Sequence, residues 1–343
     1  MGDIRTRVIF GCSGLHLTEA ERAFFSDVRP WGFILFARNI ADPAQVRALV
    51  AELRATVGDI SAPVLIDQEG GRVARLKPPH WKARPPAASF GALHAQNPEA
   101  GREAVYLNAR LIAQDLFDLG INVDCLPVLD VPVEGADSII GDRAYANDPA
   151  TIITLGRATI DGLIEGGVLP VMKHVPGHGR ATLDSHKALP RVSETAEALS
   201  ASDFVTFRSL NYCPLAMTAH VVYEAFDPHR PATLSPKVVR DVIRGEIGFD
   251  GVLMSDDLSM GALEGPIRAR TKAALFAGCD IVLHCNGDMA EMQEVATELK
   301  PIEEATERRI NHIRAALKTP GDFDPAQAEA RLNALMAEPV EAP

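Results

Sequence analysis

The stretch VLPVMKHVPG, residues 168–177, decides the fold of this chain. It begins as an apolar run over residues 168–172, continues with two polar residues, Lys173 and His174, and ends in Val-Pro-Gly. A strand with one face in water would alternate apolar and polar residues, whereas a continuous apolar run is typical of a parallel strand buried on both faces. This stretch therefore predicts a central strand with polar chemistry at its carboxyl end.

The same pattern recurs along the chain and predicts eight β/α units. Amphipathic patterns typical of helices lie between the apolar runs, and they suit the crossover helices that parallel strands need. The other expected strands are 8–14, 32–36, 63–71, 121–131, 215–223, 251–260 and 279–287, and the expected helices include 18–28, 42–58, 98–120, 193–210 and about 264–278.

Eight such units predict a TIM barrel, a closed (β/α)8 fold, in a single domain over residues 1–343. Two further helical patterns, 300–317 and 324–337, predict extra C-terminal helices over about 300–338 that pack on the barrel. The competing architecture is a doubly wound open sheet, which usually carries a glycine-rich first turn. The sequence GCSG at 11–14 is too short for that motif.

Composition limits the classes of partner and the compartment. The net charge is −12 and the basic residues are scattered, which argues against nucleic acid as the main partner. No segment approaches the ~20 apolar residues that span a membrane, and the N-terminus does not read as a signal peptide. The five cysteines include no CxxC pair and are expected to be buried, reduced thiols. We expect a cytoplasmic monomer.

Polar residues gather where the predicted strands end. In a barrel the carboxyl ends of all strands share one rim, and that rim carries the active site. The residues at these ends are Asp67, Arg75, Asp130, Lys173, His174, His220, Asp256 and Asp257.

The densest cluster of titratable residues is KHVPGHGRATLDSH, residues 173–186. A metal site formed by His174, His178 and His186 would lie on a Gly/Pro loop, and the chain lacks the HxH pair expected of a metal-dependent barrel hydrolase. A phosphate loop would need a GxxxxGK[ST] order, which is absent. We therefore expect no metal and no cofactor.

The remaining interpretation of this cluster is an acid/base device. Asp184 and His186 are two residues apart, so the carboxylate can orient the imidazole, although an isolated DxH is also found as a plain turn contact. We expect Gly177 and Gly179 to let this segment swing, carrying His186 toward and away from the site.

Two further motifs supply carboxylates. In GVLMSDDLSM, Asp256 is the better candidate to point into the barrel mouth, and Asp257 to cap the following turn. In DQEGGRVARL, Asp67 could accept hydrogen bonds from sugar hydroxyls, while Glu69 is interpreted as shaping the loop.

Arginines near these motifs are further candidates. Arg72 and Arg75 are three apart, so at most one is expected to face the site. Arg143 in IIGDRAY suits either a site contact or a surface ion pair.

Together, the motifs DQEGGRVARL (67–76), IIGDRAY (139–145), KHVPGHGRATLDSH (173–186) and MSDDLSM (254–260) resemble glycoside hydrolase family 3. Within that family they are most similar to the single-domain β-N-acetylglucosaminidases of the NagZ type. The resemblance implies a retaining exo-β-N-acetylglucosaminidase, a β-N-acetylhexosaminidase that releases terminal GlcNAc. The implied natural substrate is a muropeptide in which GlcNAc is linked to anhydro-N-acetylmuramic acid, handled in peptidoglycan recycling.

The resemblance also implies roles for individual residues. Asp256 would be the nucleophile, and His186 the acid/base with Asp184 as its partner. Substrate contacts would fall on Asp67, Arg75, Arg143, Lys173 and His174. Three alternatives stay open: a β-N-acetylglucosaminide phosphorylase with phosphate as acceptor, a β-glucosidase or β-xylosidase of the same fold, and a non-enzymatic sugar-binding sensor.

Overall fold

The computed structural model describes residues 5–186 and 188–337, and eight parallel strands close into a barrel within them. The order around the barrel is β1-β10-β9-β7-β5-β4-β3-β2. These strands are β1 (Thr6–Gly11), β2 (Pro30–Leu35), β3 (Val64–Ile66), β4 (Val123–Asp124), β5 (Leu169–Val175), β7 (Leu215–Thr218), β9 (Val252–Asp257) and β10 (Ile281–His284). The predicted TIM barrel is confirmed, and the doubly wound open sheet is excluded.

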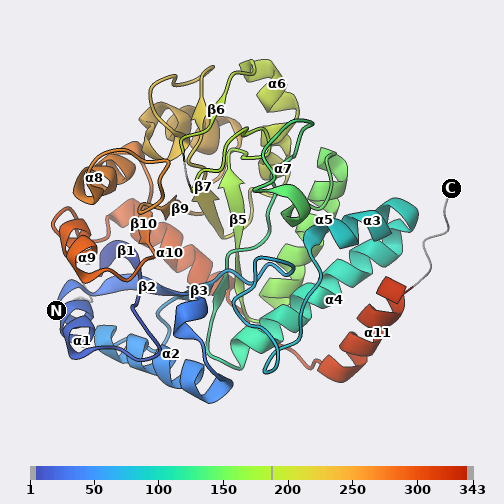
Figure 1. Cartoon of the computed structure of the whole chain (residues 1–343), viewed down its shortest axis with the longest axis horizontal. Helices are drawn as coiled ribbons and strands as arrows, with labels where there is room; N and C mark the ends of the chain where they lie inside the picture. The colour runs from blue at the N-terminus through green and yellow to red at the C-terminus, as the bar shows by residue number, and fades with distance from the viewer. Residues whose placement is uncertain (1–4, 187, 338–343) are drawn as a thin grey trace.

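Helices surround the barrel, as Figure 1 shows. A separate two-stranded sheet, β6 (Arg191–Val192) with β8 (Val222–Tyr223), lies outside the barrel. The helices are α1 (Glu19–Val28), α2 (Pro43–Val57), α3 (Ala87–Gln96), α4 (Pro98–Phe117), α5 (Pro149–Glu165), α6 (Ala196–Ala201), α7 (Asp203–Ser209), α8 (Ile267–Ala277), α9 (Met289–Ala296), α10 (Glu304–Ala316) and α11 (Pro325–Ala337). Short 3-10 turns occupy η1 (Ala37–Asn39), η2 (Gly141–Arg143) and η3 (Ala232–Leu234), and η4 (Val238–Glu246) is π-helical.

Local sequence explains where several helices begin and end. Thr18 and Glu21 form the predicted capping box of α1, and Asp42 accepts hydrogen bonds from the first turn of α2. Gly58 ends α2 in the left-handed conformation. The helix predicted over 193–210 is interrupted, because Ser202 has φ −125° and ψ −67°, outside the helical region, so α6 and α7 are separate helices.

The barrel interior is filled by alternate residues of its strands. Val252 and Met254 of β9 and Val171 of β5 belong to one buried cluster inside the barrel. Because strand side chains alternate between faces, the next inward positions are Asp256 on β9 and Lys173 on β5. The same alternation that packs the interior therefore delivers a carboxylate and an ammonium group to the carboxyl end of the barrel.

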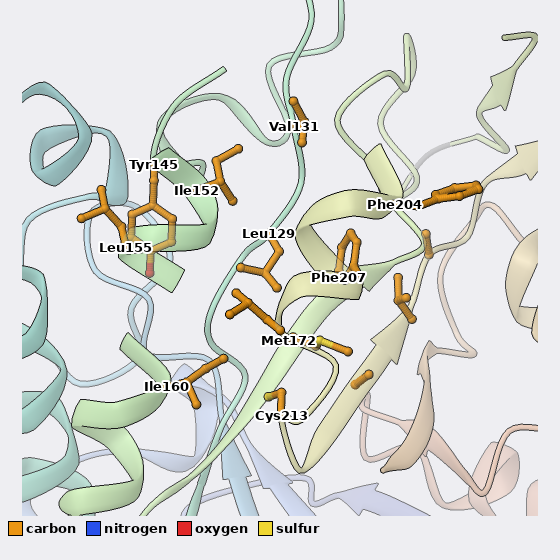
Figure 2. Close-up of a cluster of buried hydrophobic side chains, with 14 of the residues drawn as sticks. Leu129, Val131, Tyr145, Ile152, Leu155, Ile160, Met172, Phe204, Phe207 and Cys213 are labelled. Carbon is orange, nitrogen blue, oxygen red and sulfur yellow. The ribbon is translucent and has the colours of Figure 1, made fainter. Parts of the chain in front are cut away.

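A second core lies between the barrel and the outer helices. Figure 2 shows Met172 of β5 in a cluster with Leu129, with Phe207 of α7 and with Ile160 of α5. Met172 faces this outer core because it has the opposite parity to Lys173. Helix α5 was missed from the sequence, although Asp148 caps its first turn.

The predicted strand 121–131 is regular only over Val123–Asp124, and its later residues still pair with β5 in irregular form. Lys173 N–H donates to the Pro127 carbonyl at 3.0 Å, and Leu129 N–H donates to the Lys173 carbonyl at 2.8 Å. Pro127 has no N–H to give, which interrupts the ladder. The apolar run is therefore longer than the strand.

The two predicted C-terminal helices, α10 and α11, are both formed. Ile310 and Ile313 of α10 join the buried cluster inside the barrel. Helix α11 lies along α4 (Figure 1), and Arg331 makes two hydrogen bonds of 2.7 Å to Glu103. Residues 1–4 and 338–343 of the predicted domain lie outside the described residues. Within the described ranges, no helix is both long enough and apolar enough to cross a membrane.

Candidate active site

A cavity of about 320 Å³ opens at the carboxyl ends of the barrel strands. It collects seven of the eight residues predicted to form the site: Asp67, Arg75, Arg143, Lys173, His174, His186 and Asp256. The eighth, Asp184, is hydrogen-bonded to His186. Side chains from segments almost 190 residues apart in the sequence therefore meet in one hollow, as the barrel topology predicts.

Buried ion pairs form one wall of this cavity. The Lys173 side chain is 2% exposed, and its Nζ lies 2.9 Å from Asp67 Oδ1 and 2.6 Å from Glu69 Oε1. Arg75 Nη2 donates to Asp67 Oδ2 at 3.0 Å, and Arg143 forms two bonds of 2.8 Å to Glu69. Three cations thus surround two carboxylates, so each buried charge has an opposite partner.

The charges in this wall fix its protonation. Burial by itself would raise the pKa of Asp67, but the positive charges of Lys173 and Arg75 outweigh burial and hold that pKa well below its usual range. The pKa of Glu69 is also lowered, because Lys173 and Arg143 outweigh its burial. Burial opposes the charge on Lys173, yet the two carboxylates raise its pKa above the usual range. The wall is therefore fully ionised at neutral pH and offers both acceptors and donors to a ligand.

Asp256 lies at the end of β9, and its carboxylate faces the cavity. Its Oδ1 accepts the Asp257 N–H at 2.8 Å, and its own N–H donates to Thr218 Oγ1 at 3.3 Å. Burial favours the neutral carboxyl, but the charges of His220 and His174 outweigh it and lower the pKa of Asp256. Asp256 is therefore an anion at neutral pH.

Asp257 has a different environment from its neighbour. Its Oδ1 accepts N–H groups of Ser259 at 3.0 Å and Cys285 at 3.1 Å, so it holds the turn after β9, as predicted. His220 follows β7, and its two ring nitrogens contact Thr233 Oγ1 at 2.7 Å and the Asp257 carbonyl at 3.0 Å. His220 thus braces the backbone behind Asp256.

Asp130 orients His174 from behind. Its Oδ2 lies 2.7 Å from His174 Nδ1, and its Oδ1 accepts the backbone N–H groups of His174 at 3.2 Å and His178 at 2.6 Å. Burial would raise the pKa of Asp130, but His174 outweighs burial and lowers it, so the carboxylate accepts the proton on Nδ1. The other ring nitrogen of His174, Nε2, is left for a ligand in the cavity.

Asp184 and His186 form the predicted pair. Asp184 Oδ1 lies 2.9 Å from His186 Nδ1 and also accepts the His186 backbone N–H at 2.9 Å. The His186 side chain is 60% exposed, and it lines the same cavity as Asp256. The carboxylate fixes the proton on Nδ1, so Nε2 is the atom that can exchange a proton with a ligand.

Gly177 and Gly179 both lie where the backbone packs closely against its neighbours, and the predicted swing of the segment after them stays a prediction. A Cβ atom on Gly179 would lie 2.0 Å from the Val131 carbonyl oxygen, and one on Gly177 would lie 3.1 Å from Asp203 Cβ. The Gly177 carbonyl also accepts a hydrogen bond from the buried Tyr223 hydroxyl. Glycine is required at position 179 because the backbone passes so near its neighbour, and the φ of 141° at Gly177 favours glycine there.

Three residues of the site were not assigned to it from the sequence: Glu69, His178 and Ser185. Asp130 was placed at the rim from the sequence but was given no role there. Glu69 follows Asp67 by two residues, the spacing that places side chains on one face of an extended segment, and this signal could have found it. His178 was considered only as a metal ligand. Among residues 5–186 and 188–337, no cluster of three or more His, Cys, Asp or Glu side chains is arranged to hold a metal ion.

Comparison with known proteins agrees with this geometry. Residues 11–316 match the family model for the glycosyl hydrolase family 3 N-terminal domain. The chain belongs to glycosyl hydrolase family 3. The beta-hexosaminidase of Alkalilimnicola ehrlichii is 39% identical over 285 residues, which cover 81% of this chain and 80% of that protein. The beta-hexosaminidase of Thiobacillus denitrificans is 37% identical, with 96% and 86% covered.

Solved structures extend the likeness of this family 3 chain to the whole fold. NagZ from Neisseria gonorrhoeae, in complex with N-trifluoroacetyl-D-glucosamine, superposes with a TM-score of 0.86 and 30% identity. That match covers 97% of this chain and 99% of NagZ. The resemblance inferred from the motifs is thereby confirmed, and the chain is a glycoside hydrolase.

Proposed function

We propose that this family 3 chain is a retaining exo-β-N-acetylglucosaminidase that releases terminal GlcNAc from β-linked saccharides. Relatives that cover most of the chain are named beta-hexosaminidase, which supports the coarser activity of a β-N-acetylhexosaminidase. The NagZ structure holds a derivative of glucosamine acylated on nitrogen, which supports a 2-acetamido sugar as the ligand.

The observation that carries the proposal is that Asp256 and His186 line one cavity with opposite chemical properties. Asp256 is a partly buried anion whose Oδ1 is engaged by a backbone N–H, so Oδ2 is the oxygen available for attack. His186 is exposed to the cavity mouth, with Nδ1 held by Asp184. A nucleophile and a separate proton carrier are the two groups that retaining hydrolysis needs.

In the first step, Asp256 Oδ2 forms a bond to the anomeric carbon as the bond from that carbon to the leaving oxygen breaks. The imidazolium of His186 gives its Nε2 proton to the leaving oxygen and becomes neutral. Asp184 keeps the ring oriented and stabilises the charged form.

In the second step, neutral His186 takes a proton from water at Nε2. The water oxygen bonds to the anomeric carbon, the bond to Asp256 breaks, and the carboxylate is restored. The sugar leaves with the β configuration retained, and both residues return to their starting protonation states.

The ionised wall would hold the sugar during both steps. We assign hydroxyl contacts to Asp67, Arg75, Arg143, Lys173 and His174. The mutual ion pairs of these side chains limit their motion, so they are already oriented when the sugar arrives.

For the natural substrate we propose a muropeptide with GlcNAc linked to anhydro-N-acetylmuramic acid, cleaved during peptidoglycan recycling in the cytoplasm. The enzyme would act as a monomer and a single catalytic domain, with no metal or cofactor. The motif resemblance supports the substrate, and the five buried free cysteines suit a reducing compartment.

The test is Asp256→Ala, assayed on an aryl β-N-acetylglucosaminide. We expect kcat to fall on the order of 10⁶-fold, as when the nucleophile of a hydrolase is removed. The matched control is Asp250→Ala, an aspartate whose side chain is 76% exposed and which pairs with Arg309 at 3.0 Å outside the cavity. That variant should turn over like the wild type, and wild-type turnover by Asp256→Ala would disprove the nucleophile assignment.

A second measurement addresses the intermediate and the acceptor. His186→Ala should let an activated aryl glycoside load Asp256 but should slow its release, so intact-protein mass spectrometry should detect a glycosyl-enzyme. Product analysis in phosphate buffer should give free GlcNAc. A sugar 1-phosphate as the main product would favour the phosphorylase alternative over the hydrolase.

A further inference from the structure

The segment that carries Asp184 and His186 is firmly held where it leaves the barrel. The Ala181 carbonyl accepts the Asp137 N–H at 2.8 Å. Arg180 Nε donates to the buried Asp203 at 2.7 Å. The backbone is therefore fixed up to about residue 181, and the five residues that follow determine where the His186 ring lies.

Three hydrogen bonds tie the far end of this segment to other parts of the barrel rim. Ser185 Oγ lies 3.0 Å from His178 Nε2. The carbonyls of Ser185 and His186 accept the N–H groups of Ala262 at 3.1 Å and Gly261 at 3.3 Å. Of these contacts, the bond between Ser185 and His178 is the one that uses side chains, so mutation can remove it.

Burial distinguishes Ser185 from the residues on either side. Ser185 is 3% exposed, whereas the side chains of Asp184 and His186 are 19% and 60% exposed. A small polar residue is thus buried between the two members of the acid/base pair. The hydroxyl of a buried serine needs a partner, and His178 provides it.

His178 is itself a rigid anchor. It is 3% exposed, its backbone N–H donates to Asp130 at 2.6 Å, and its ring packs edge-on against His174 with centroids 5.6 Å apart. Burial and the neighbouring His174 lower the pKa of His178 to about 4, so its ring is neutral at pH 7. A neutral imidazole suits a hydroxyl partner, and Ser185 meets one of its two ring nitrogens.

We infer that His178 and Ser185 are positioning residues, which form a side-chain latch that holds His186 over Asp256 for proton transfer. Neither residue exchanges the proton itself. The inference rests on the proposed function, because it presumes that His186 is the acid/base. It assigns a role to His178 of the motif PGHG and to Ser185 of the motif DSH, two residues that take no part in the mechanism proposed above.

The experiment measures kcat/KM on two substrates, phenyl and 2,4-dinitrophenyl β-N-acetylglucosaminide. The phenolate leaving group needs a proton from His186, and the dinitrophenolate does not. Because kcat/KM reports the first chemical step, a mispositioned His186 should slow only the phenyl substrate. A merely structural defect would slow both substrates alike.

We expect Ser185→Ala to lower kcat/KM for the phenyl glycoside about tenfold, the factor that one lost hydrogen bond allows, with little change for the dinitrophenyl glycoside. Ser185→Thr keeps the hydroxyl and should retain nearly full activity. His178→Ala should slow the phenyl glycoside selectively, as Ser185→Ala does. The double variant should have a kcat/KM for the phenyl glycoside no lower than that of the less active single variant.

His186→Ala separates failure of the latch from failure of the proposed function. If His186→Ala is selectively slow on the phenyl substrate but Ser185→Ala is not, the latch is refuted and the acid/base assignment stands. If His186→Ala slows both substrates equally, the acid/base assignment and the latch both fall. Additive losses in the double variant would also refute the latch.

Discussion

Replacing Lys173 by methionine should strongly destabilise the protein, because it leaves the buried carboxylate of Glu69 and the partly buried carboxylate of Asp67 short of positive charge. The Lys173 ammonium lies 2.9 Å from Asp67 and 2.6 Å from Glu69, with its side chain 2% exposed. Methionine fills a similar volume, so the main change is the charge. Water carries no net charge, so it cannot neutralise the two carboxylates that the ammonium group of Lys173 neutralises.

The size of the effect follows from the partners that remain. Removing one partner of a buried ion pair typically costs about 3–5 kcal/mol. Asp67 keeps Arg75 at 3.0 Å and Glu69 keeps two bonds of 2.8 Å to Arg143, so we expect the lower end, about 3 kcal/mol at pH 7.

The matched control is the same substitution at the surface, Lys82→Met. The Lys82 side chain is 65% exposed and lies 3.5 Å from Glu329, so solvent screens the pair. We expect that variant to lose less than about 0.5 kcal/mol. Urea unfolding followed by far-UV circular dichroism gives both values, and equal slopes for the variants would show that the midpoint shifts report stability.

The pH dependence provides a second check on the same reasoning. The pKa values of Asp67 and Glu69 are depressed in the folded protein, so the stability they contribute is present above their unfolded values, about 3.9 and 4.3. It is lost as pH falls through the folded pKa values. In Lys173→Met the pKa values of Asp67 and Glu69 are lowered less, so these two carboxylates bind protons at a higher pH than in the wild type. Once they are protonated, the variant no longer carries unbalanced negative charge in the wall.

The stability gap between the wild type and Lys173→Met should therefore be widest near pH 7 and should narrow toward pH 4. Equal losses for Lys173→Met and Lys82→Met at pH 7 would refute the account of the buried wall. If the stability difference between the wild type and Lys173→Met stays constant as the carboxylates protonate, the loss of stability is not electrostatic.

Other predictions concern packing, pH and metal. Gly179→Ala should lower the free energy of unfolding in urea by about 1–3 kcal/mol, because the added Cβ would lie 2.0 Å from a backbone oxygen. Gly321→Ala, where an added Cβ meets nothing within 4 Å, should leave stability nearly unchanged. Equal losses in the two variants would contradict the packing argument. The lowered pKa of Asp256 predicts that the acid limb of kcat/KM lies below pH ~4, and a limb near pH 6 would oppose it. Dialysis against EDTA should leave turnover unchanged, and a loss that zinc restores would overturn the metal-free mechanism.

Much of the barrel could be predicted from local sequence. The continuous apolar runs located all eight barrel strands, because strands buried on both faces tolerate few polar residues. Capping residues set the ends of α1 and α2. Helix α5 and the break at Ser202 were missed, because the first lacked a pattern that we recognised and the second depends on backbone angles that the sequence does not announce.

Some features of the candidate site could likewise be predicted from the sequence, and others could not. By itself, the sequence determined which strands end in Asp67, Lys173 and Asp256, since the parity that buries their apolar neighbours also turns these side chains inward. Only the tertiary structure decided that Glu69 shares Lys173 with Asp67, and that His178 meets Ser185. Such pairings depend on where the closed barrel brings separate loops together, and hydrogen bonds act over about 3 Å, a precision that no spacing along the chain conveys.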